Sequence, residues 1–390
     1  MRRIWRILRN VALLLLAFAL VVAVWKHDEI RRLIAVNRLF AEDRIVANFS
    51  AMDRAFLTRP MAVAGGDPLP QGPAAALPEG LEDWLAARQV TGLVVLHRGQ
   101  VVAEDYRLGT GRDDLRIQWS ISKSVLSLLY GILLEEAAVP PLDTPIVEAV
   151  PALAGSAYAG ATLRDAMTMS SGIGFNEDYL DYHSDINRMG RVLALGGSMD
   201  AFAAGQSVRA APPGSRWQYV SIDTHVIAMA IRQATGRSLP DLMQDRLLRP
   251  LAPEHDAYFL TDGYGVAFAL GGMNMTTRDI ARIGLMVARG GEWDGRQIVP
   301  AGWIAESTRA SAPGGAPYGF QWWLAGDGSG GEVFGRGIYG QYLYIHPGRD
   351  VVIAVNAADR GFRNPGVHEG NIAMFRAIAE AVSSNGDPDE

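Results

Sequence analysis

Ser120 and Lys123 are the residues of this sequence whose types and spacing best suit a chemical reaction. The apolar stretch over residues 125–133 predicts a helix that starts near Ser120, which places the two side chains on one face. A serine hydroxyl is a weak nucleophile until a neighbouring base takes its proton. Burial against an apolar helix lowers the pKa of a lysine towards the range of a working base, and the helix N-terminus favours negative charge on the serine. The pair therefore predicts a nucleophile with its own base.

Lysine is nearly absent from this sequence, which adds weight to that pair. Lys and Arg together number 36, and only Lys26 and Lys123 are lysine. Because an arginine keeps its proton in a protein, Lys123 is the one amine base available to the folded body. An arginine-rich composition alone would also leave a stray lysine, so the argument depends on its place at a helix start. Cysteine is absent, which excludes a thiol nucleophile, disulfides and thiolate metal sites.

Tyr219 and Ser221 stand directly before a second apolar stretch, over residues 223–234, that is predicted to be a helix. A tyrosine at such a helix entry can project its phenol into a neighbouring cleft and relay a proton to a leaving group. An ordinary half-buried tyrosine is the alternative, since the chain has 12 tyrosines. Taken alone, Tyr219 fits the ordinary interpretation better, so its catalytic role depends on the other motifs of the chain.

A glycine motif occurs late in the chain, at residues 335–340. Its spacing matches G-x-G-x-x-G, but a predicted strand follows it instead of a helix, which argues against a dinucleotide site. Glycines that enter a strand let a ligand approach the backbone closely, which makes Gly337 a candidate substrate contact. The backbone N–H groups of Ser120 and Ile338 are then predicted to form an oxyanion hole.

Other catalytic and metal motifs are missing from the sequence. It contains no G-x-S-x-G, H-E-x-x-H or G-x-x-x-x-G-K pattern, and its seven histidines show no metal-ligand spacing. We therefore expect no metal and no cofactor. A Ser–His–Asp triad stays open as an alternative, because sequence spacing does not reveal a spatial triad, and His225 is left without a role.

The elements that must position these residues follow from the hydrophobic periodicity. Alternating apolar stretches with turn residues between them predict two β-hairpins, over residues 92–107 and 341–355. The segments between and after them have helical spacing, and the main predicted helices cover 120–138, 223–234, 277–289 and 371–382. Strands at both ends with helices between them predict an α+β fold, with one antiparallel sheet built from both chain ends and a mostly helical insertion.

The N-terminus differs from the rest of the chain. Residues 11–25 are an unbroken apolar run behind four arginines, and no small-residue cleavage pattern follows. The arginines before the run outnumber the cations just after it, which predicts a cytoplasmic N-terminus. We expect residues 1–32 to be an uncleaved signal anchor that crosses a bacterial inner membrane once, with the body on the periplasmic side. The alternative is a cleaved signal peptide and a secreted body.

The body divides into two predicted parts. Residues 33–80 are expected to be a unit that wraps the body. It consists of most of an amphipathic helix predicted over residues 30–57 and of a linker. Residues 81–385 are expected to be the hydrolase domain, with its sheet at about 81–118 and 318–385 and its helical region at about 140–300. Residues 1–32 contribute seven basic and two acidic side chains, so the remainder carries a net charge of −11 against −6 overall. An acidic body without a basic stripe argues against nucleic-acid binding.

Taken together, the motifs resemble the serine β-lactamase and penicillin-binding protein superfamily, in particular its class C-like branch, which includes esterases and the 6-aminohexanoate-dimer hydrolase. Further similar stretches between residues 38 and 382 are 163–172, 271–275, 318–323 and 337–341. The resemblance implies a β-lactamase/transpeptidase-like fold and an acyl-enzyme on Ser120. It also implies that Lys123 and Tyr219 act as base and proton relay, and which of the two is the formal base stays open. Tyr179, in the segment 176–179, is implied to close over the substrate.

The chain departs from this superfamily at two motifs. The second motif usually ends in asparagine, where this chain has Ser221, and the third is usually Lys-Thr-Gly, or has His in first place, where this chain has Gly335-Arg336-Gly337. The missing side chains hold the amide and carboxylate of a β-lactam, so we favour a small ester or linear amide as substrate, with Arg336 free to pair with a substrate carboxylate. A DD-peptidase or β-lactamase acting on peptidoglycan-type substrates is one alternative, and a catalytically idle ligand-binding relative is the other.

Overall fold

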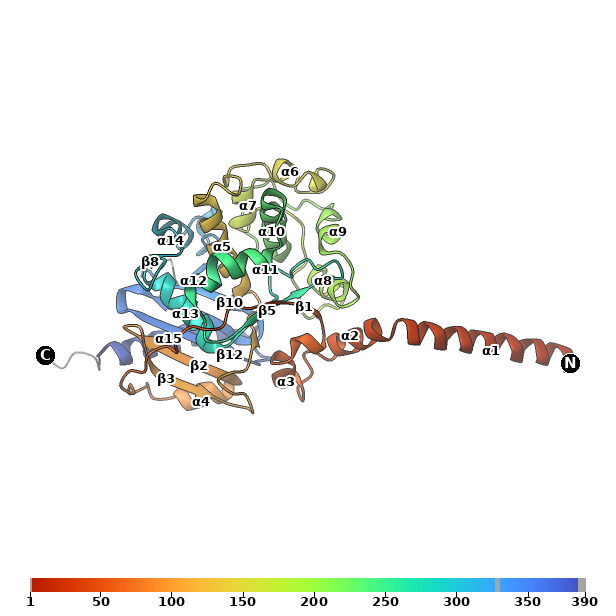
Figure 1. Cartoon of the computed structure of the whole chain (residues 1–390), viewed down its shortest axis with the longest axis horizontal. Coiled ribbons are helices and arrows are strands. Elements are labelled where there is room, and N and C mark those ends of the chain that lie inside the picture. The colour runs from red at the N-terminus through yellow and green to blue at the C-terminus, as the bar shows by residue number, and fades with distance from the viewer. Residues whose placement is uncertain (1, 327–329, 385–390) are drawn as a thin grey trace.

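The computed structural model describes residues 2–326 and 330–384 (Figure 1). The largest sheet formed by these residues has six antiparallel strands. Its order is β3-β2-β12-β11-β10-β9. The strands are β2 (Val90–His97), β3 (Gln100–Tyr106), β9 (Trp323–Leu324), β10 (Val333–Gly337), β11 (Gln341–His346) and β12 (Val351–Ala357). Because β2 pairs with β12, the first and last hairpins join into one sheet, which confirms the prediction that both chain ends build it.

Side chains of this sheet alternate between two apolar cores. On β2, Val94 belongs to the larger core and its neighbour Leu93 to the smaller one. Helix α13 (Thr277–Ala288) packs on the first face, and α4 (Leu81–Ala87) and α15 (Val367–Ser384) pack on the other. A sheet covered on both faces explains why β2 and β12 read as continuous apolar runs.

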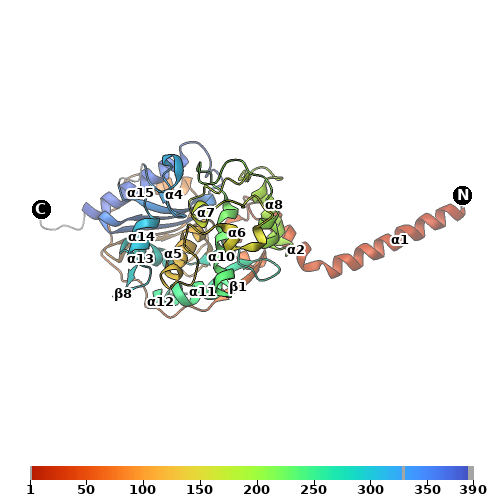
Figure 2. The same cartoon turned by 90° about the horizontal axis from the view of Figure 1, so that it is seen from above.

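The helices between the two halves of the sheet form the other part of the body (Figures 1 and 2). α5 (Ile121–Glu135) is buried from Ile121 to Leu133, and α10 (Ser221–Thr235) is buried from Ser221 to Ile231. The others are α6 (Ile146–Ala149), α7 (Leu163–Met167), α8 (Asp185–Ala194), α9 (Met199–Ala204), α11 (Leu239–Leu242), α12 (Arg249–Leu251) and α14 (Ala301–Ser307). The predicted α+β fold with a mostly helical insertion is confirmed, and the four predicted helices agree with α5, α10, α13 and α15 except for a few terminal residues.

A smaller sheet has four strands in the order β1-β5-β6-β4. They are β1 (Leu57–Met61), β4 (Arg116–Ile117), β5 (Ala257–Thr261) and β6 (Met273–Met275). A separate hairpin consists of β7 (Glu292–Trp293) and β8 (Arg296–Gln297). Since β4 leads directly into α5, the four-stranded sheet sets the position of Ser120.

The single helix predicted over residues 30–57 is wrong. The segment forms α2 (His27–Asn37), a run of turns, α3 (Ile45–Phe49), a short 3₁₀ turn and the start of β1. Leu39 and Met52 both enter the main core. A straight helix of this length would extend about 40 Å and carry part of its apolar face beyond the body, so the chain folds back on itself instead.

Helix α1 (Arg2–Trp25) extends away from the body and has no buried residue (Figures 1 and 2). At 1.5 Å per residue it is about 36 Å long, which exceeds the ~30 Å hydrocarbon thickness of a bilayer. By length and composition it is able to cross a membrane. α2 follows almost at once and packs on α8, which connects the apolar helix to the body.

Candidate active site

Ser120 lies at the start of α5, where two constraints fix its position. After β4 ends at Ile117, the N–H of Gln118 donates to the carbonyl oxygen of Met273 on β6 at 2.9 Å. Trp119 then adopts a left-handed conformation with φ of 45°, which turns the chain sharply into the helix and is strained for a large side chain. Ser120 is therefore held at the helix N-terminus, where the helix dipole favours negative charge.

The Lys123 side chain reaches back to Ser120 from the first turn of α5. Its Nζ lies 2.7 Å from Ser120 Oγ and donates to the carbonyl oxygen of Leu270 at 2.9 Å. Lys123 is only 1% exposed. Burial lowers the pKa of Lys123 to about 7, while the negative charge of Glu177 acts in the opposite direction. A lysine with this pKa is partly neutral near pH 7 and can take the proton of the serine hydroxyl.

Tyr219 lies on the segment that enters α10. The Nζ of Lys123 is 5.1 Å from the centroid of the Tyr219 ring, and this ring stacks on Trp323 with centroids 5.5 Å apart. Burial raises the pKa of Tyr219, and a hydrogen bond with Ser120 offsets part of the rise. The phenol is therefore protonated at neutral pH. The structure thus brings together the three residues that the sequence analysis singled out as nucleophile, base and relay.

The segment of α10 beside Tyr219 is fixed by a buried carboxyl group. Asp223 accepts hydrogen bonds of 2.8 Å from the hydroxyls of Tyr158 and Ser171. Burial raises the pKa of Asp223 to about 8, so this group is largely protonated at pH 7. Ser171 belongs to the stretch 163–172, which is therefore bonded to α10 through this buried carboxyl group.

Glu177 is a member of the site that the sequence analysis did not select. Its Oε1 accepts the N–H of Ser221, and its Oε2 accepts the hydroxyl of Tyr179 at 2.9 Å. Burial raises the pKa of Glu177, and the charge of Lys123 opposes this rise. Burial therefore moves the pKa values of Glu177 and Lys123 towards each other. The one sequence signal for Glu177 is its place two residues before Tyr179, because nothing in the sequence connects this loop to Lys123.

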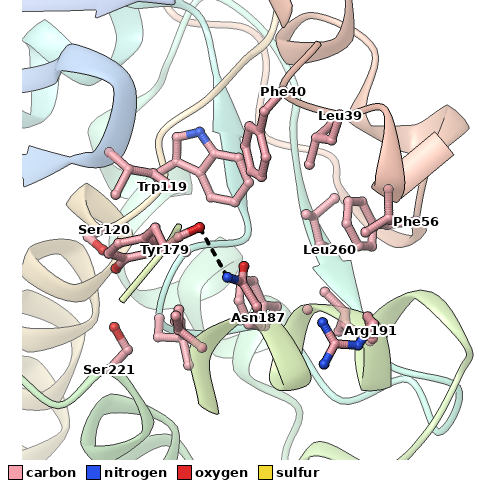
Figure 3. Close-up of a pocket in the computed structure, with 18 of the residues that line it drawn as sticks. Leu39, Phe40, Phe56, Trp119, Ser120, Tyr179, Asn187, Arg191, Ser221 and Leu260 are labelled. Carbon is pink, nitrogen blue, oxygen red and sulfur yellow. Dashed lines mark hydrogen bonds between the residues drawn. The ribbon is translucent and has the colours of Figure 1, made fainter. Parts of the chain in front are cut away.

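The loop that carries Tyr179 is fastened to the segment after β12. Asp178 Oδ1 accepts a hydrogen bond from Arg363 Nη1 at 3.0 Å, and the Tyr179 ring contacts the Phe362 ring edge-on with centroids 6.4 Å apart. The side-chain amide of Asn187 donates to the carbonyl oxygen of Tyr179 at 3.1 Å, as the dashed line in Figure 3 marks. These contacts hold Tyr179 over the site.

A cavity of about 290 Å³ opens beside Ser120 (Figure 3). Its walls are mainly apolar and come from the segment 36–56, from α8 and the loop before it, and from residues 260–271. The sequence-predicted residues that line it are Ser120, Tyr179, Ser221 and Ile338. Ser120 and Ile338, whose N–H groups are the predicted oxyanion hole, thus border the same space.

Gly337 has a packing role that the sequence analysis did not foresee. It does not line the cavity. A Cβ atom at this position would lie 2.8 Å from the carbonyl oxygen of Gln118 and 3.0 Å from the Cβ of Trp119. The absence of a side chain therefore lets β10 approach the residues just before Ser120 and positions the neighbouring Ile338.

Arg336 also lies outside the cavity lining, on the side of the site where Tyr219 is found. Its guanidinium is 5.9 Å from the centroid of the Trp323 ring on which Tyr219 stacks, and its charge lowers the pKa of Tyr219 slightly against the effect of burial. A role of Arg336 in substrate binding stays a prediction.

A Ser–His–Asp triad would require a histidine beside Ser120. Within the described ranges no histidine lines the cavity, and His225 is bonded to Asp200 at 2.8 Å instead. The same residues contain no group of three or more His, Asp or Glu side chains placed to hold a metal ion. A Ser–His–Asp triad around Ser120 is therefore not formed.

A serine at a helix start, a buried lysine in contact with it, and an apolar cavity beside both define the class of protein. The molecule is a serine hydrolase with a β-lactamase/transpeptidase-like fold. Residues 79–375 match the family model described as Beta-lactamase, so the chain belongs to the beta-lactamase family, as the resemblance of its motifs indicated.

Individual relatives agree with this membership. A 6-aminohexanoate-dimer hydrolase of Paenarthrobacter ureafaciens is 33% identical over 298 residues, which cover 72% of this chain and 75% of the relative. A Bacillus anthracis structure, provisionally named a 6-aminohexanoate-dimer hydrolase, has a TM-score of 0.78 at 23% identity over 89% of this chain and 96% of its own. A family VIII carboxylesterase has a TM-score of 0.56 at 15% identity over 80% and 99% of the two chains. The two structures show the fold alone.

Proposed function

We propose that this protein hydrolyses a small carboxylic ester or linear amide through an acyl-enzyme on Ser120. The observation that carries the proposal is the 2.7 Å separation of Lys123 Nζ and Ser120 Oγ, together with the burial that lowers the pKa of Lys123 to about 7. The relative named as a 6-aminohexanoate-dimer hydrolase supports the reaction class.

Acylation begins when Lys123 takes the proton of the Ser120 hydroxyl and Oγ attacks the substrate carbonyl carbon. The negative charge that develops on the carbonyl oxygen is stabilised by the N–H groups of Ser120 and Ile338. As the bond to the leaving group breaks, Tyr219 donates its proton to that group and recovers one from Lys123. The products of this half-reaction are the Ser120 ester and a free alcohol or amine.

Deacylation runs the same proton path in reverse. A water molecule loses a proton to the Tyr219–Lys123 pair as its oxygen attacks the acyl carbon, and the proton then returns to Ser120 Oγ as the acid leaves. The phenol hydrogen-bonds to Ser120, and the amine lies against the face of the same ring, so both groups reach the reacting oxygen. The pH dependence of turnover distinguishes Lys123 from Tyr219 as the formal base.

The substrate is an ester or linear amide rather than a β-lactam. Ser221 and Gly335-Arg336-Gly337 replace the asparagine and the lysine–threonine pair that hold a β-lactam in this superfamily. The cavity beside Ser120 is mainly apolar, which suits the hydrocarbon part of a small acyl compound.

The test is covalent labelling combined with turnover of short-chain p-nitrophenyl esters. A fluorophosphonate probe is expected to modify Ser120, and Ser120→Ala is expected to abolish both labelling and turnover. Ser127→Ala is the matched control and is expected to keep both labelling and turnover. Ser127 also lies on α5, and its buried hydroxyl has no hydrogen-bond partner among the described residues. Full activity in Ser120→Ala overturns the proposal. A stable or turned-over penicillin adduct in mass spectrometry supports the β-lactamase or DD-peptidase alternative, and no labelling at all supports the inactive relative.

We also propose that α1 anchors the enzyme in a bacterial inner membrane with the body in the periplasm. The length and apolar composition of α1, its four leading arginines and its full exposure support this arrangement. Intact protein in the membrane fraction, digested by protease only after the outer membrane is opened, is the expected result. A soluble body that lacks the first 25 or so residues supports signal cleavage and secretion instead.

A further inference from the structure

The cavity beside Ser120 contains a single charged side chain among the described residues, that of Arg191. The remaining lining is apolar or uncharged, and no carboxylate borders it. Figure 3 places Ser120 and Arg191 at opposite ends of this space, with Leu260 and Phe56 at the Arg191 end. A chain that starts at the Ser120 oxygen and follows the apolar walls therefore ends at a cation.

The Arg191 guanidinium is held in place without being neutralised. Its Nη1 donates to the carbonyl oxygen of Tyr182 at 2.8 Å, and its central carbon lies 4.0 Å from the centroid of the Tyr182 ring. No ion pair forms between Arg191 and an acidic side chain in the described part of the chain, whereas Arg188 on the same helix pairs with Asp185 at 2.9 Å. A fixed, unpaired guanidinium at the end of an apolar space attracts an anionic ligand group.

The position of Tyr219 decides which part of the substrate enters this cavity. The leaving group must contact the phenol that protonates it, and Tyr219 is not part of the cavity lining. Its ring faces Trp323, with Arg336 beside that ring. The leaving group therefore lies on the Trp323 side of Ser120, and the acyl group extends towards Arg191.

We propose that the cavity is an acyl-binding site for a chain that ends in an anionic group, such as the acyl part of a hemi-ester or hemi-amide of a dicarboxylic acid. This inference rests on the proposed acyl-enzyme chemistry and adds the class of substrate to it. The apolar walls accommodate the methylene chain, and Arg191 pairs with the terminal carboxylate. An acyl chain that ends in an ammonium group is repelled at the same place.

The experiment compares p-nitrophenyl esters of equal chain length that differ only at the far end of the acyl chain. The three end groups are a carboxylate, its methyl ester and an ammonium, and the number of methylene groups is varied from two to eight. At the best length we expect kcat/KM for the carboxylate to exceed that for the methyl ester by about tenfold or more, the range of a charge-assisted hydrogen bond, and the ammonium compound to be the poorest. Because Arg191 is partly exposed, this preference should weaken as salt is added.

Two variants assign the preference to one side chain. Arg191→Met is expected to bring the carboxylate-to-methyl-ester ratio close to one, and Arg188→Met, which removes the same charge from the same helix outside the cavity, is expected to keep it. The inference is overturned if the preference for the carboxylate survives Arg191→Met, or if the unaltered enzyme has no such preference. In either case, hydrolysis of the neutral esters still upholds the proposed function.

A binding measurement keeps the inference testable if no ester is turned over. Trp119 lines the cavity, so its fluorescence reports occupancy in the Ser120→Ala protein. Octanedioate monomethyl ester is expected to bind this protein at least about tenfold more tightly than the corresponding dimethyl ester, and additional replacement of Arg191 by Met is expected to remove the difference. Equal affinities rule out the anionic site whatever the fate of the ester assays.

Discussion

The pH dependence of turnover tests the assignment of Lys123 as the base most directly. Burial lowers the pKa of Lys123 to about 7, and only the neutral amine can take the proton of Ser120. With a pKa of about 7 the neutral fraction is about 3% at pH 5.5 and about 97% at pH 8.5, so kcat/KM should rise about thirtyfold between these values. The rise should have unit slope below pH 7 and level off above it.

The assay is hydrolysis of a neutral p-nitrophenyl ester, corrected for spontaneous hydrolysis and measured at subsaturating substrate so that kcat/KM reports the free enzyme. Circular dichroism at each pH confirms that the fold persists across the range. Because the ester carries no ionisable group, the titration belongs to the protein. A profile that continues to rise towards pH 10 refutes the lowered lysine pKa, and a profile that is flat from pH 5.5 to 8.5 refutes the lysine as base.

Replacement of Glu177 should shift the pH profile of turnover in a direction that the structure predicts. The negative charge of Glu177 raises the pKa of Lys123 against the effect of burial. Glu177→Gln removes this charge, so the acid limb of the profile should move to lower pH. Asp178→Asn removes an exposed charge from the neighbouring position and should leave the limb in place. A limb that moves to higher pH in Glu177→Gln, or moves equally in both variants, contradicts the assignment of Lys123 as the titrating group.

Three further outcomes follow from the geometry of the site. Lys123→Met should lose at least about a hundredfold in kcat yet melt a few degrees higher at pH 6. The lowered pKa of Lys123 means that burying the charged amine costs stability below pH 7, so the gain in Tm should shrink as the pH approaches 10. A variant that melts lower than the unaltered protein at pH 6 contradicts this reasoning. Gly337→Ala should lower kcat/KM about tenfold, since its Cβ would meet the Gln118 carbonyl oxygen, whereas Gly302→Ala, with open space around its Cβ, should have no effect. Arg363→Gln breaks an exposed ion pair with Asp178 and should raise KM by no more than about threefold; a larger change would mean that closure of the Tyr179 loop limits binding.

The sequence predicts the parts of the site that depend on local geometry. Ser120 and Lys123 are three residues apart on one helix, so their contact follows from the helical period alone. The hairpins were also predictable, because their strands and turns are adjacent in the chain. Residues whose role depends on how distant segments meet were not. The charge of Glu177 acts on Lys123 only because the loop before α8 meets the start of α10 at Ser221, and no spacing in the sequence describes that approach.

The same distinction explains the error in the segment 30–57. Its apolar residues are spaced like those of a helix, and α2 and α3 are helical. Tertiary structure overrides the pattern at Leu39, which enters the core, and at Leu57, where β1 begins and pairing with β5 supplies the backbone hydrogen bonds of a strand. Nothing within the segment indicates β5 as a partner, since it lies about 200 residues away in the chain.

Chemistry and substrate selection have different origins in this chain. Ser120, Lys123 and Tyr219 all lie within residues 79–375, the part that matches the family model. Leu39, Phe40 and Phe56, which form one wall of the cavity, lie before that part and fold between α2 and β1. The match to the family model therefore includes the segments that carry Ser120, Lys123 and Tyr219 but not this wall of the cavity. Direct measurement of acyl preference, with Arg191 as the residue to vary, consequently says more about its substrate than the name of any relative.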